Sequence, residues 1–88
     1  MYFNKRISVV IPTLGGEQIY QTLEAINSSL IVPDEIIICI PELEATKLRL
    51  DHFSNVKICV SSIRGQVPQR ALGFKVASGD FVIQLDDD

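Results

Sequence analysis

Residues Ile7–Pro12 have the sequence ISVVIP, and this stretch decides the fold. Its β-branched, nearly uninterrupted apolar side chains are typical of a strand that is buried on both faces, as in a parallel sheet. We therefore predict that this segment is the first and central strand of a sheet, covered on both sides by other parts of the chain.

The residues that follow predict a helix and a second strand. Residues 17–29 come after the Gly15-Gly16 turn and carry apolar side chains at helical spacing, so we expect an amphipathic helix that covers the sheet. The predicted apolar stripe of this helix consists of Ile19, Leu23, Ile26 and Leu30. Residues 35–40 (EIIICI) predict a second buried strand, which ends at Pro41 because proline cannot donate a ladder hydrogen bond.

A weak helix signal and a third strand come next. Residues 42–52 carry Leu43, Leu48 and Leu50 among charged side chains, which indicates a helix only weakly. Residues 56–60 (VKICV) predict a third strand, and the mixed polarity of this segment favours an edge position.

The last part of the chain completes the alternation of strands and helices. Residues 66–77 are rich in helix formers, and Pro68 is compatible with a helix only in its first turn. Residues 81–85 (FVIQL) predict the last strand. This order implies an α/β fold with a mostly parallel sheet, flanking helices and right-handed crossovers.

Size and composition exclude several classes of protein. The 88 residues make one domain at most, and the net charge of -3 has the wrong sign for a protein that binds the phosphates of nucleic acid. Cys39 and Cys59 lie in apolar runs without a CxxC pattern, so we predict buried free thiols and a cytoplasmic location. No apolar run near the N-terminus approaches the ~18 residues of a membrane span.

Candidate functional residues follow the predicted strands. In open α/β sheets ligands bind at the carboxyl ends of strands, where we place residues 12–13, 40–42, 61–65 and 86–88. Side chains of an extended segment alternate, so Asp86 and Asp88 can point the same way and offer two carboxylates to Mg²⁺ or Mn²⁺. Such a cation commonly bridges carboxylates to phosphates, which suggests a nucleoside diphosphate as ligand. The alternative is a solvated acidic tail.

The same segments resemble a known family. The matching residues are ISVVIPT at 7–13, EIII at 35–38, the spacing of Gly65, Arg70, Gly73 and Gly79-Asp80, and LDDD at 85–88. In this order and spacing they resemble the family 2 glycosyltransferases of GT-A fold. The resemblance implies a Rossmann-like, nucleotide-sugar-binding half with the strand order 3-2-1-4, and it makes residues 1–88 the N-terminal part of a longer domain.

The resemblance also implies roles for single residues. Pro12 and Thr13 would line the base pocket, and Arg70 would lie in the stretch that approaches the nucleotide. Asp86 and Asp88 would form the DxD pair, with Asp88 as the first choice of metal ligand and Asp86 towards the ribose or the sugar. Asp87 fills the variable position and is assigned to the nucleotide-sugar site. Glu42 could supply a displaced carboxylate, because Ile40, Pro41 and Glu42 stand where the family has an acidic pair.

The whole enzyme would use Mn²⁺ or Mg²⁺ and a UDP-, TDP- or GDP-linked sugar. Its acceptor would be a saccharide or a lipid-linked acceptor, and the full-length protein could be membrane-peripheral. The acceptor pocket and the catalytic base would belong to the C-terminal part, so we expect no turnover from residues 1–88 alone. The chain departs from the family at Leu14-Gly15, where Tyr-Asn is usual, and at Ala71, where Asn is usual.

Alternative interpretations remain for the protein and for its residues. A non-catalytic α/β interaction module is the main rival function, whereas Gly15-Gly16 fits neither a dinucleotide-binding fingerprint nor a P-loop. Thr13 could instead satisfy a local turn, Arg70 could be a solvated helix residue, and His52 is assigned to the surface. The apolar last strand would expose an edge, so we also predict self-association.

Overall fold

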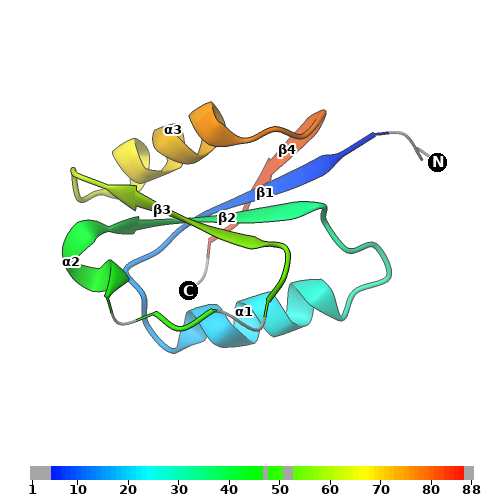
Figure 1. Cartoon of the computed structure of the whole chain (residues 1–88), viewed down its shortest axis with the longest axis horizontal. Coiled ribbons are helices and arrows are strands. Elements are labelled where there is room, and N and C mark those ends of the chain that lie inside the picture. The colour runs from blue at the N-terminus through cyan, green and yellow to red at the C-terminus, as the bar shows by residue number, and fades with distance from the viewer. Residues whose placement is uncertain (1–4, 47, 51–52, 87–88) are drawn as a thin grey trace.

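The structure is a computed structural model that describes residues 5–46, 48–50 and 53–86. The elements are β1 (Ile7–Pro12), α1 (Gln18–Asn27), β2 (Glu35–Pro41), α2 (Glu42–Ala45), β3 (Val56–Ser61), α3 (Gln66–Val76) and β4 (Phe81–Gln84). The strands form one parallel sheet in the order β3-β2-β1-β4 (Figure 1). The predicted α/β class and strand order are confirmed, and β3 lies at an edge as expected.

The two faces of the sheet are covered by different helices. Figure 1 shows α1 and α2 on one side of the strands and α3 on the other. Because successive side chains of a strand point to opposite faces, β1 directs Val9 and Ile11 into the core under α1 and Val10 into a smaller core under α3. The fully apolar sequence of β1 therefore reflects burial on both faces.

Helix α3 lies very close to the sheet at Gly73. A Cβ atom at this position would stand 2.4 Å from Val10 Cγ1 and 2.5 Å from Cys39 Sγ. These distances are shorter than any tolerated carbon contact, so only glycine allows the helix to approach this far. Pro68 lies in the first turn of α3, as predicted.

The prediction that Leu30 extends the apolar stripe of the first helix is wrong. Helix α1 ends at Asn27, and Leu30 is 101% exposed, while Ile19 and Leu23 are buried and Ile26 is partly buried. The physical reason is the serine pair after the helix: the Ser29 hydroxyl donates to Ile26 O at 2.6 Å and ends the helical hydrogen-bond pattern before residue 30.

The weak helix signal over residues 42–52 corresponds to a single turn. Helix α2 covers only Glu42–Ala45, and Leu43 is 83% exposed. Leu48 and Leu50 are buried in the core under α1, whereas Arg49 between them is exposed. Residues 48–50 have no regular secondary structure, and a spacing of two residues between buried side chains is not helical, which explains why helical periodicity was weak. No helix in the described ranges is long and apolar enough to cross a membrane.

The two cysteines are free thiols in unequal surroundings. They stand side by side in the register of β2 and β3, but Cys39 is buried and Cys59 is only partly buried, because β3 is an edge strand. The prediction of burial is therefore correct for Cys39 and wrong for Cys59. Burial raises the pKa of the Cys39 thiol to about 12, and the neighbouring Cys59 adds to the increase.

Candidate functional site at the carboxyl ends of the strands

A hollow of about 460 Å³ opens where β1 ends. One wall comes from the end of β1 and the loop that leads to α1, and the other from the loop between β3 and α3 together with the first turns of α3. The lining residues are Pro12, Thr13, Leu14, Gly16, Gln18, Arg64, Gly65, Gln66 and Gln69. The hollow therefore lies at the edge of the sheet where ligands of open α/β folds bind.

The two walls are joined by Gln69, a buried side chain of α3 with 2% exposure. Its amide nitrogen donates to Thr13 O at 2.9 Å and to Cys39 O at 2.8 Å, and its amide oxygen accepts from Gly65 N at 3.0 Å. One side chain thus connects the ends of β1 and β2 to the loop that begins α3. We infer that Gln69 sets the shape of the hollow.

Sequence analysis did not identify Gln69. Gln69 and Gly73 are the two buried residues of α3, and they are four residues apart on the face that meets the sheet. A glutamine one turn before a glycine that contacts the sheet is the signal that could have revealed it, because residues at i and i+4 share a helix face.

Pro12 and Thr13, which the resemblance assigned to a base pocket, both line the hollow. Thr13 is 4% exposed, its N–H donates to Cys39 O at 3.0 Å, and its hydroxyl oxygen accepts from Gly15 N at 3.0 Å. The hydroxyl therefore takes part in the local turn, which sequence analysis gave as the alternative interpretation. These main-chain hydrogen bonds hold Thr13 in place before any ligand enters the hollow.

Asp86 is connected to the hollow through glutamine side chains. Its Oδ1 accepts from Gln66 Nε2 at 3.3 Å and from Gln84 Nε2 at 2.9 Å, and Gln66 is one of the lining residues. Arg70 donates from Nη1 to Gln84 Oε1 at 3.2 Å. The structure therefore brings together Asp86 and Arg70, which are 16 positions apart in sequence, beside the first turns of α3.

The remaining predicted site residues are not joined to this group. Glu42 is exposed at the start of α2 and is not among the residues that line the hollow. Asp87 and Asp88 lie outside the described residues, as does His52. Within residues 5–46, 48–50 and 53–86, no group of three or more His, Cys, Asp or Glu side chains could hold a metal ion.

Among the described residues, the Asp86 carboxylate supplies part of the oxygen ligand set that a hard cation such as Mg²⁺ prefers. Asp86 is exposed, and both amide hydrogens that reach it meet the same oxygen, Oδ1. Mg²⁺ in proteins commonly binds one or two carboxylates together with substrate phosphates and water. A single carboxylate beside a hollow is compatible with that arrangement.

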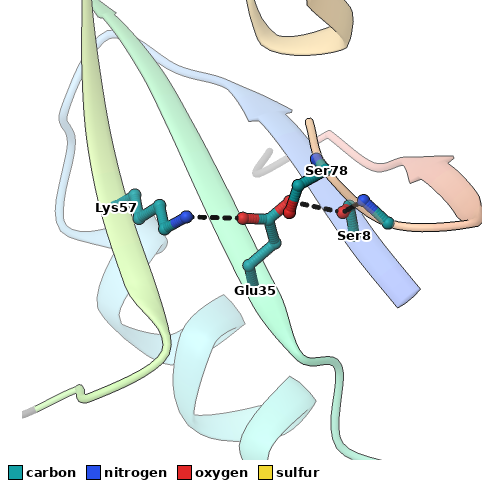
Figure 2. Close-up of polar contacts among 5 residues, drawn as sticks. Ser8, Glu35, Lys57 and Ser78 are labelled. Atoms are coloured by element: carbon teal, nitrogen blue, oxygen red, sulfur yellow. Dashed lines mark hydrogen bonds and ion pairs between the residues drawn. The ribbon is translucent and has the colours of Figure 1, made fainter. Parts of the chain in front are cut away.

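A second polar cluster lies at the opposite, amino-terminal end of the strands. Glu35 begins β2 and is 1% exposed; its Oε1 accepts from Lys57 Nζ at 2.8 Å, and its Oε2 accepts from the Ser8 hydroxyl at 2.6 Å (Figure 2). The N–H and the hydroxyl of Ser78 donate to the same Oε2 at 2.6 and 2.9 Å. This one carboxylate connects β1, β2, β3 and the segment between α3 and β4.

The hydrogen bonds determine the charge state of Glu35. Burial by itself raises the pKa of this carboxyl group, but the bonds from Lys57, Ser8 and Ser78 outweigh it and lower the pKa to about 2. Because every acceptor contact is made inside the protein and at the end of the sheet away from the hollow, Glu35 stabilises the fold and is not part of the candidate site.

Comparison of the chain with protein-family models, with curated proteins and with solved structures yields no match. Function has to be inferred from the side chains at the strand ends.

Proposed function

We propose that this chain binds a nucleoside-diphosphate sugar together with Mn²⁺ or Mg²⁺ and supplies the donor site of a glycosyltransferase. The observation that carries the proposal is the connection of Asp86, through Gln66, to a hollow at the carboxyl ends of parallel strands. The hollow would hold the nucleotide, and the carboxylate beside it would face the diphosphate.

The lining of the hollow has the chemistry that such a ligand needs. Pro12 and Leu14 offer apolar surface to a planar base. Arg64 brings a cation, and α3 begins at Gln66 inside the hollow, so the partial positive charge of its amino end favours a phosphate there. A divalent cation bound at Asp86 would neutralise charge on the departing diphosphate.

The residues of α3 would hold these groups in position. Gln69 joins the two walls by hydrogen bonds, and Gln84 donates to the Asp86 carboxylate while Arg70 in turn donates to Gln84. The side chain of Asp88 would complete the cation site with Asp86, and Asp87 would belong to the nucleotide-sugar site, as the resemblance implies. The acceptor and the catalytic base are assigned to the C-terminal part of a longer protein.

Calorimetric titration of UDP, GDP and TDP, with and without Mn²⁺, tests this proposal. We expect binding that depends on Mn²⁺ and that weakens about tenfold or more in Asp86→Asn and in Asp88→Asn. Glu24→Gln on the exposed surface of α1 is the matched control, because it removes one negative charge away from the strand ends. Binding that is unaffected by both aspartate substitutions, or no binding of any of the three nucleotides, would support the interaction-module alternative.

A separate titration tests the hypothesis for Glu42. If Glu42 contributes a carboxylate to base recognition, Glu42→Ala weakens nucleotide binding with and without the metal. Unchanged affinity in this variant would remove Glu42 from the site.

A further inference from the structure

The two cysteines stand opposite each other on neighbouring strands. Cys39 of β2 and Cys59 of β3 are partners in the parallel register of the sheet (Figure 1). Register partners of a parallel pair direct their side chains to the same face, and adjacent strands lie about 4.8 Å apart. A disulfide spans Cα atoms that are about 4.4–6.8 Å apart, so the strand pairing by itself provides the separation that a disulfide needs.

Both thiols belong to the small core under α3. Cys39 is 0% exposed there and packs with Val10 and Ile37, and Cys59 packs against this group from the edge strand. Gly73 of α3 lies over Cys39, since a Cβ atom added to it would stand 2.5 Å from Cys39 Sγ. The sulfur of Cys39 is therefore enclosed by β1 and α3, and its neighbour on the remaining side is Cys59. Each of these contacts is made by β1, β2, β3 or α3, so the pair is complete within residues 10–73.

The two sulfur atoms differ in their access to solvent. Cys59 is partly exposed because β3 is an edge strand, whereas Cys39 is fully buried. Burial raises the pKa of the Cys39 thiol to about 12, and the nearby Cys59 adds to the increase. A small oxidant therefore meets Cys59 first, and Cys39 is placed to react with the group that forms on the Cys59 sulfur.

The pair also adjoins the candidate site. The main-chain oxygen of Cys39 accepts from Gln69 Nε2 at 2.8 Å and from Thr13 N at 3.0 Å, and both of these residues line the hollow. Position 39 is thus connected to the wall of the hollow by its carbonyl group and faces the edge strand with its thiol. A bond formed at the Cys39 sulfur therefore acts on a residue that also anchors this wall.

We propose that Cys39 and Cys59 form a peroxide-sensitive dithiol, in which hydrogen peroxide oxidises Cys59 and Cys39 then closes a reversible disulfide between β2 and β3. In the first step the Cys59 thiolate attacks one oxygen of the peroxide. The S–O bond forms, the O–O bond breaks, and the departing hydroxide takes up the proton of the thiol and leaves as water. The product is a sulfenic acid at Cys59.

In the second step the Cys39 sulfur attacks the Cys59 sulfur. The S–S bond forms, the S–O bond breaks, and the departing hydroxide leaves with the Cys39 proton as a second water. The two thiols together lose two electrons, and one peroxide molecule is reduced to two waters. Because the pKa of Cys39 is raised to about 12, little of its reactive thiolate is present at neutral pH, so the sulfenic acid should persist long enough to be trapped.

Mass spectrometry of the intact chain tests the proposal. At low micromolar protein with a small excess of hydrogen peroxide, the wild-type monomer should lose the mass of two hydrogen atoms, and dithiothreitol should restore it. Tryptic digestion without reductant should yield residues 7–47 joined to residues 58–64, which carry Cys39 and Cys59. In Cys39→Ala the sulfenic acid has no thiol to react with in the same chain, so dimedone should label Cys59 instead.

The matched control moves the second thiol to the other face of β3. Ile58 is 43% exposed and has Ile38 as its register partner, so its side chain points to the face under α1. The double variant Cys59→Ser with Ile58→Cys should therefore form no disulfide while it is folded. In urea it should form one, because the sheet no longer separates the two thiols.

Three results would each overturn the proposal. They are a wild-type chain that resists oxidation or gains only oxygen at Cys59, disulfides that link only separate chains, and a folded control variant that closes the disulfide as the wild type does. Oxidation is measured without nucleotide, so its outcome is independent of the titrations above.

Discussion

The buried carboxylate of Glu35 should make the free energy of unfolding of this protein fall as the pH is lowered through the acidic range. The pKa of Glu35 is lowered from 4.5 to about 2, and each pH unit corresponds to about 1.4 kcal/mol, so ionisation of this group contributes about 3 kcal/mol to the free energy of unfolding at neutral pH. Since the pKa is lower in the folded state, this contribution is present above about pH 5 and is lost as the pH falls towards about 2.

The substitution Glu35→Gln isolates this effect. An amide of the same shape cannot accept from Lys57 and Ser78 at once, because one end of it carries hydrogens, so the variant should lose about 3 kcal/mol at pH 7. Other carboxyl groups titrate in both proteins and cancel in the difference between them. That difference should therefore shrink steadily from about pH 5 to about pH 2.5.

Urea denaturation of both proteins across this pH range is the measurement. Lys57→Met is the informative control: the lysine side chain is 64% exposed, so removing it should cost only about 1 kcal/mol and leave the bonds from Ser8 and Ser78 in place. A difference between wild type and Glu35→Gln that is constant with pH would refute the assignment of a low pKa to Glu35.

Other substitutions test the contacts of α3 and the two thiols. Gly73→Ala should destabilise the fold by about 1–3 kcal/mol in thermal or urea denaturation, because the added carbon overlaps Val10 and Cys39; an unchanged midpoint would contradict the close approach of α3. Gln69→Leu should cost about 1–3 kcal/mol, since the Gln69 amide bonds to Thr13 O, Cys39 O and Gly65 N are lost while Cys39 O keeps the Thr13 N–H, and it should also weaken any nucleotide binding. Mass spectrometry after brief treatment with a thiol reagent at pH 8 should find Cys59 modified before Cys39, whose burial raises its pKa to about 12; the reverse order would contradict the packing under α3.

Much of the architecture could be predicted, because the apolar pattern of each strand or helix by itself indicates which of its faces is buried. The uninterrupted apolar runs of β1 and β2 indicated strands buried on both faces, and the alternation of strands with helices indicated parallel pairing. Local hydrogen bonding explains one exception, because the Ser29 hydroxyl ended α1 before Leu30. The helix signal over residues 42–52 was weak, and Leu48 and Leu50 lie in a segment without regular secondary structure.

The candidate site was predictable in its location but not in its construction. Strand order alone places the end of β1 beside the start of α3 and the end of β4, and Pro12, Thr13 and Asp86 are found there. Gln69 was not singled out, because its position four residues before Gly73 indicates only a shared helix face, and its partners Thr13 and Cys39 are 56 and 30 positions away.

The sequence by itself determined the class of fold, because periodicity indicates which segments are strands and which are helices. The order of the strands came from the family resemblance together with the right-handedness of short connections, and ligand binding at the carboxyl ends of the strands stays a prediction. Only the tertiary structure decided that Gln69 joins the walls of the hollow, that Gly73 brings α3 against Cys39, and that Glu35 carries its charge in the interior. Each of these depends on which atoms of distant segments come within a few ångströms of each other. A repeating pattern of polar and apolar residues encodes which face is buried, and it does not encode those individual distances.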